Sequence, residues 1–215
     1  MQKRSLMVLG GALILTGLSV PAMADSFIYT LTSDGCSSSC GTAPFGTVTV
    51  TDTAANQISL VVNVLPNFLL HSGQAGSTVA FNLNPNVNNL SLVSSVLPNW
   101  SLDAPSAGSL HFATFGNFEY SLNCCNSQNG SANEQTGLNT VVLSGTGLSA
   151  ASFQQLSTGG AYFAVDIGSA TTGQTGPVGA VDGPTRNVVP EPTSIVLLGS
   201  VAALIVGASR RKLAI

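Results

Sequence analysis

The sequence is poor in charged residues, and its few basic residues lie almost entirely at its two ends. Only 7% of the 215 residues are Asp, Glu, Lys or Arg. Five of the six basic residues are in the terminal segments: Lys3, Arg4, Arg210, Arg211 and Lys212. Between these ends the chain keeps only Arg186 against eight acidic residues, a net charge of about −7. Nucleic-acid phosphates and anionic lipid headgroups require lysine and arginine, so we predict that the body binds neither.

The sequence also lacks the usual arrangements of catalytic residues. The body has no Gly-x-Ser-x-Gly turn, and neither of its histidines, His71 and His111, belongs to a metal-binding spacing. We interpret both as surface or strand-end residues. His111 lies between Leu110 and Phe112 in a strand pattern and is expected to face solvent. We therefore predict a protein that is not an enzyme and that holds no cofactor and no metal.

Two alternatives involve carbohydrate. A secreted polysaccharide hydrolase would need two carboxylates, or a serine with a histidine, brought together by the fold. The candidates whose convergence would support this are Asp103, Glu119, Glu134 and His111. A carbohydrate-binding module would instead use Trp100 as a stacking platform, although an aromatic residue more often packs on the core. Asp166 and Asp182 are further acids that could hold Ca²⁺, but no calcium-binding pattern surrounds them.

The N-terminus has the three parts of an export signal in the right order. The positively charged pair Lys3-Arg4 precedes an apolar run over residues 6–20. Ala22-Met23-Ala24 follows, with small residues, Ala22 and Ala24, at the positions that signal peptidase reads. We predict a signal peptide over residues 1–24, recognised by the Sec translocon and removed by signal peptidase. The mature protein would then begin at Asp25.

The C-terminus combines a short extended segment, an apolar run and a basic end. Pro190-Glu191-Pro192 is followed by apolar residues over 195–208 and then by Arg210, Arg211 and Lys212. A helix over residues 193–209 would be about 25 Å long, near the lower limit for crossing a bilayer. The basic cluster would stay on the cytoplasmic side. We therefore predict that a single helix anchors the chain in the inner membrane, with the body on the periplasmic side.

Residues 189–212 resemble the PEP-CTERM sorting signal of Gram-negative bacteria, in which Pro-Glu-Pro precedes a single span and a short basic cluster. The resemblance implies recognition and cleavage by an exosortase near Pro190, Glu191 and Pro192. It also implies delivery to the cell surface or to the exopolysaccharide matrix. The two prolines suit such a protease, because they hold the backbone extended. The alternative is an ordinary membrane anchor behind a proline-rich stalk.

Between the two signals the pattern is that of a mostly β protein. Apolar residues alternate with Thr, Ser or Asn in many short runs, clearest over residues 46–51, where Thr and Val alternate. The predicted strands cover 27–31, 46–51, 57–65, 68–71, 77–83, 91–97, 109–115, 118–122, 138–143 and 161–167. One short helix is expected over 150–156, after the N-cap Ser149. We predict an antiparallel β-sandwich, jelly-roll-like or similar, over residues 25–167.

The segment that follows has a different composition. Residues 168–189 are rich in Gly, Thr and Pro, and we predict a loop that merges into a linker. The sorting signal then occupies 190–215. Stretches at 46–50, 162–166 and 173–180 also resemble the ectodomain of a group of PEP-CTERM proteins of unassigned function. That resemblance implies no catalytic residues.

The four cysteines, Cys36, Cys40, Cys124 and Cys125, are predicted to form disulfides because the chain is exported. Neighbouring α-carbons are about 3.8 Å apart, below the usual range for a disulfide. We therefore expect Cys124 and Cys125 to pair across to Cys36 and Cys40, with the connectivity open. A zinc site of four thiolates is the alternative.

Overall fold

The computed structural model describes residues 23–73, 77–96, 100–103, 110–124 and 137–190. The signal peptide up to Ala22, Cys125, Glu134 and the sorting signal from Glu191 onward lie outside these residues. The predicted span and the basic end at Arg210, Arg211 and Lys212 are therefore outside them too. Within the described ranges, no helix has the length and apolar character that a membrane crossing requires.

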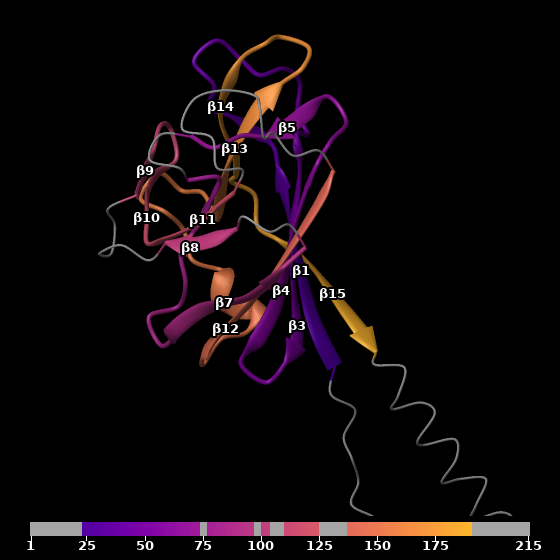
Figure 1. The fold of residues 1–215 in the computed structure, drawn as a ribbon, viewed down its shortest axis with the longest axis vertical. Coiled ribbons are helices and arrows are strands. Elements are labelled where there is room, and N and C mark those ends of the chain that lie inside the picture. Colours follow the sequence, from indigo (N-terminus) through magenta and orange to yellow (C-terminus); the bar gives the residue numbers. More distant parts are fainter. Residues whose placement is uncertain (1–22, 74–76, 97–99, 104–109, 125–136, 191–215) are drawn as a thin grey trace, which may run out of the picture. The chain divides into compact units, whose positions relative to one another are not determined.

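The first sheet contains six described strands in the order β15-β1-β3-β4-β12-β7 (Figure 1). Their bounds are Thr185–Pro190 for β15, Met23–Leu31 for β1, Gly46–Ala54 for β3, Gln57–Val64 for β4, Leu138–Thr146 for β12 and Asn88–Ser95 for β7. Burial alternates along β3 and β4, because every second side chain enters the core. Asn56, with φ of 61°, makes the tight turn between them.

The second sheet has the order β2-β14-β13-β6-β11-β8, and β5 also pairs with β13. The bounds are Ser33–Asp34 for β2, Thr175–Ala180 for β14, Phe163–Ser169 for β13, Val79–Phe81 for β6, Tyr120–Asn123 for β11, Ser101–Asp103 for β8 and Phe68–Leu70 for β5. A separate hairpin consists of β9 (Leu110–Phe112) and β10 (Gly116–Phe118). Neighbouring strands run antiparallel in the pairs β1–β3, β3–β4, β4–β12, β6–β11 and β13–β14.

The two sheets share one apolar core. Val50 and Leu60 of the first sheet belong to the same buried cluster as Phe81, Phe163 and Val165 of the second. The inward faces of both sheets are therefore removed from water together, which is the main source of stability for a domain of this size. The prediction of a mostly β protein with antiparallel sheets is confirmed.

A second, smaller cluster covers the opposite face of the second sheet. Phe112, Phe115 and Phe118 pack there on Ala80 and Ala164. Ala164 alternates with the core residues Phe163 and Val165, so it points to the outer face of β13. Because this outer face is covered as well, every residue of β13 is buried. The β9–β10 hairpin, at the left in Figure 1, is the main cover.

Two sequence predictions need correction. The helix is a single 3₁₀ turn, Ala150–Phe153, rather than a helix over 150–156. Residues 168–189, predicted as loop and linker, contribute the strands β14 and most of β15. The glycines of β14 serve close packing: a Cβ on Gly179 would collide with the Phe115 ring, and one on Gly176 with Cys36. The glycine content therefore reflects near neighbours in the fold, which composition does not reveal.

Candidate functional site

A cleft of about 590 Å³ opens on the outer face of the second sheet. Its walls are the segment 35–37, the start of β14 at 175–177 and the hairpin residues 111–114. Gly73, Ser77 and Asp166 complete the lining. The volume lies within the range typical of small-ligand sites. This cleft is the candidate functional site.

Asp166 lies where β13 changes its partner strand. The residue before it pairs with Val79 of β6, and the residue after it pairs with Leu70 of β5. Its own backbone N–H donates to Thr78 O at 2.8 Å, and its carbonyl accepts from His71 N at 3.0 Å. Residues 71–73 and 77–78, which lie between these contacts in the sequence, belong to neither strand. The divergence of β5 and β6 therefore opens the surface beside the Asp166 side chain.

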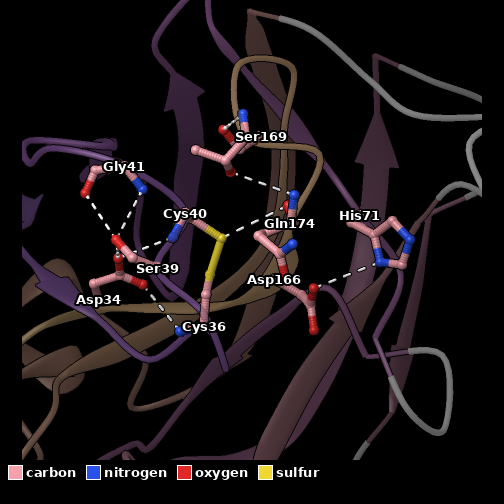
Figure 2. Close-up of a disulfide and its surroundings, with 10 residues drawn as sticks. Asp34, Cys36, Ser39, Cys40, Gly41, His71, Asp166, Ser169 and Gln174 are labelled. Carbon is pink, nitrogen blue, oxygen red and sulfur yellow. Dashed lines mark hydrogen bonds and ion pairs between the residues drawn. A yellow bond between two sulfur atoms is a disulfide. The ribbon is translucent and has the colours of Figure 1, made fainter.

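The Asp166 carboxyl is buried but remains part of the cleft lining. Asp166 is 8% exposed and is one of the residues that line the cleft. Burial raises the pKa of this carboxyl, and the nearby His71 only partly opposes the effect. His71 Nδ1 lies 3.5 Å from Asp166 Oδ1 (Figure 2). The other oxygen, Oδ2, lies against Gly73, in the space that a Cβ at that position would take. Asp166 thus places one titratable acid in a largely uncharged cleft, with His71 beside it but not among the described lining residues.

The wall at residues 35–37 is held by a local disulfide. Cys36 and Cys40 are bonded to each other, with their α-carbons 5.7 Å apart. The carboxylate of Asp34 accepts hydrogen bonds from Cys36 N at 2.9 Å, Cys40 N at 3.0 Å and the Ser39 hydroxyl at 2.7 Å (Figure 2). Burial acts to raise the pKa of Asp34, but these hydrogen bonds, led by that of Ser39, outweigh it and lower the pKa. Asp34 therefore folds the loop around its own side chain.

The predicted cross-pairing of the cysteines is wrong. Asp34 curls the chain so that Cys36 and Cys40 fall within disulfide reach of each other. Cys124 is also disulfide-bonded, and no cysteine in the described part is free. The alternative of four zinc-binding thiolates is excluded, because oxidised sulfurs are not thiolates. Asp34, Cys36 and Cys40 lie close enough to resemble a metal cluster, but the disulfide and the donors around Asp34 account for all three.

The other singled-out residues fall in separate places. His111 is exposed as predicted, lines the cleft, and has Nδ1 2.9 Å from Asn117 Oδ1 across the hairpin. Asp103 is exposed on β8 and Glu119 is partly buried after β10, and neither lines the cleft. Glu134 lies outside the described residues. The described part of the chain therefore does not bring the four hydrolase candidates together.

Trp100 and Asp182 also have structural roles away from the cleft. Trp100 is 7% exposed and belongs to the main core, which confirms the core interpretation and removes it as a sugar platform. Asp182 accepts a hydrogen bond from the Thr32 hydroxyl at 3.0 Å. It lies two residues beyond the end of β14 at Ala180, whereas Asp166 pairs with Pro177 near that strand's start. Asp166 and Asp182 therefore lie at opposite ends of β14 and do not form a shared Ca²⁺ site.

Sequence reasoning missed the juxtaposition of Asp166, His71 and Gly73. One signal was available, because Asp166 is an acid within the apolar strand Phe163–Ser169. A charged residue in such a strand is rarely buried without a reason. No comparable signal in the sequence points to His71 as its neighbour. A comparison of the chain with protein families, curated protein sequences and solved structures finds no match.

Proposed function

We propose that this protein is an exported, non-enzymatic component of the bacterial cell surface or extracellular matrix, processed by an exosortase and associated with exopolysaccharide. Its body would be a β-sandwich of the jelly-roll-like kind. The Sec translocon and signal peptidase would act on the N-terminal signal. The C-terminal helix would hold the chain in the inner membrane until the exosortase cleaves near Pro190-Glu191-Pro192.

The observation that carries the sorting proposal is the order of Pro-Glu-Pro, apolar run and basic cluster in the sequence. The position of β15 is compatible with it. This strand ends at Pro190, so the described body extends to the first residue of the motif. β15 is hydrogen-bonded to β1, whose first two residues, Met23 and Ala24, belong to the predicted signal-peptidase site.

The cleft supports binding better than turnover. Asp166 is the one carboxylate among the described lining residues, whereas a glycosidase of the usual kind needs two. His111 is hydrogen-bonded to Asn117 rather than to a serine that it could activate as a nucleophile. A polysaccharide hydrolase remains the alternative. Purified protein should show no turnover of a polysaccharide panel, and turnover lost in an Asp166→Asn variant that still folds would favour the hydrolase.

The sorting proposal is tested in a host that contains an exosortase. An antiserum against the body should find the wild-type protein at the surface or in the medium, with a mass that lacks the residues after the Pro-Glu-Pro. Glu191→Gln should leave full-length protein in the inner membrane. Asp103→Asn is the matched control, because it removes one exposed acid elsewhere. Normal delivery and normal mass of the Glu191 variant would contradict the proposal.

A further inference from the structure

The charge distribution of the described body limits the polysaccharides that it can bind. Arg186 is its one basic residue in the described part, and its guanidinium forms two hydrogen bonds of 2.8 Å with the Asp25 carboxylate. This pair joins β15 to β1 and contributes nothing to the cleft lining. An anionic saccharide would therefore meet a negative body with no cation to receive it. A neutral or positively charged saccharide meets no such barrier.

Asp166, at the floor of the cleft, favours a positively charged ligand group. Asp166 is buried, so its ionised form has lost much of its hydration. One oxygen faces His71, while Oδ2 accepts no hydrogen bond from the described residues. A ligand that brings a positive N–H donor to this oxygen would replace the missing hydration with a charge-assisted hydrogen bond. The remaining titratable lining group in the described part is His111, which lies on the hairpin and is exposed.

The walls suit a sugar ring. Ser37, Thr114 and Thr175 are exposed at the cleft and offer hydroxyl groups to hydroxyls of a ligand. The half-buried ring of Pro177 presents apolar surface at the cleft that can cover the C–H face of a pyranose. Hydroxyl-rich walls with an apolar patch and one acid at the floor match a polyol that carries a single amine.

We propose that this cleft binds an amino sugar in its protonated, non-acetylated form, with the ammonium group placed against Asp166. The inference deepens the proposed exopolysaccharide association by naming the sugar chemistry. It concerns the cleft, so it is tested separately from sorting. Failure of surface delivery with intact sugar binding would overturn only the sorting proposal. Normal delivery without sugar binding would overturn only this one.

The test measures binding of defined oligosaccharides to the full chain in non-ionic detergent by isothermal titration calorimetry. The probes are oligomers of glucosamine, the same oligomers N-acetylated, and oligogalacturonate, which is negatively charged. Because burial raises the pKa of Asp166, binding is measured at several values from about pH 6 to 7.5, above the ordinary carboxyl range. At the pH of tightest binding, glucosamine oligomers should bind at least about tenfold more tightly than the acetylated ones. Oligogalacturonate should not bind. Equal affinity for the first two probes, or preference for oligogalacturonate with or without added Ca²⁺, would overturn the proposal.

Variants then locate the site. Asp166→Asn keeps the size of the side chain and removes its charge, so it should abolish the preference for the free amine. Asp103→Asn is the matched control and should bind as wild type does, because Asp103 is exposed on β8 and does not line the cleft. Ser37→Trp serves if the Asp166 variant fails to fold. It fills the cleft from the exposed rim and should block all binding. Wild-type affinity in Ser37→Trp would overturn the proposal.

Discussion

The carboxylate of Asp166 occupies the space in which a side chain on Gly73 would begin. The two residues come from distant parts of the chain and meet where β5 and β6 separate along β13. The glycine is therefore required by its neighbour and not by its backbone angles, because its φ is not among the positive values. This relationship sets the shape of the cleft floor.

Replacing Gly73 by Ala should destabilise the protein by about 1–3 kcal/mol, because the added methyl group overlaps the Asp166 carboxylate. Chemical denaturation in guanidinium chloride measures the change. Gly183→Ala is the matched control, since nothing lies within 4 Å of a Cβ there, and its effect should stay within about 0.5 kcal/mol. In an Asp166→Ala background the Gly73 penalty should shrink. An equal penalty in both backgrounds would contradict the overlap.

The Asp166 carboxyl should make stability fall as pH rises through the mildly acidic range. Burial raises its pKa in the folded protein, with His71 acting in the opposite direction. The folded state therefore binds more protons than the unfolded state between the ordinary carboxyl pKa of about 3.9 and the raised value. The free energy of unfolding decreases with pH across that window.

Unfolding curves of wild type and Asp166→Asn over this pH range check the prediction. The variant should show a flatter pH dependence. Asp52, whose pKa is also raised by burial, contributes equally to both proteins and cancels in the comparison. Asp103→Asn should follow the wild-type profile. Parallel profiles for wild type and Asp166→Asn would show that Asp166 does not titrate differently in the two states.

Peptide mapping without reductant should place a disulfide between Cys36 and Cys40. Protease fragments that contain both residues should be lighter by two hydrogens than after reduction. No fragment should link this segment to the one that contains Cys124, although Cys124 should also be found oxidised. A cross-link between the two segments would contradict the structure.

Asp34→Ala should destabilise the loop that closes the cleft wall. The carboxylate accepts hydrogen bonds from Cys36 N, Cys40 N and the Ser39 hydroxyl, and bonds to a charged acceptor contribute about 1.5–3 kcal/mol each at most. We expect a loss of about 1–3 kcal/mol and faster reduction of the disulfide by dithiothreitol. Ser38→Ala, at an exposed position of the same loop, is the control. Unchanged stability and reduction rate in Asp34→Ala would exclude this role.

The ion pair between Arg186 and Asp25 should contribute little to global stability. The two side chains are 57% and 28% exposed, and exposed ion pairs contribute at most about 1 kcal/mol. Arg186→Gln should lower the free energy of unfolding by less than about 1 kcal/mol and increase amide exchange within β15. Both effects should diminish in high salt. A loss of several kcal/mol would mean that Arg186 has a partner other than Asp25 and the Phe27 ring 5.9 Å below its guanidinium.

The sequence by itself determined most of the strands. The Thr and Val alternation over 46–51, the apolar run from residue 57 and the strand around Phe163 all form where predicted. These features could be predicted because a period of two is a local property, readable from neighbouring side chains. The solvent exposure of His111 and the core position of Trp100 followed from the same local reasoning.

The tertiary structure alone decided the cleft and its surroundings. β14 looks like a flexible segment by composition, but its glycines are there because Phe115 and Cys36 pack against them. Cys36 pairs with Cys40 because Asp34 curls the loop, and a count of cysteines does not contain that information. His71 meets Asp166 because β5 and β6 share one edge of β13. Contacts between residues distant in the chain depend on strand order and register, which local periodicity leaves undetermined.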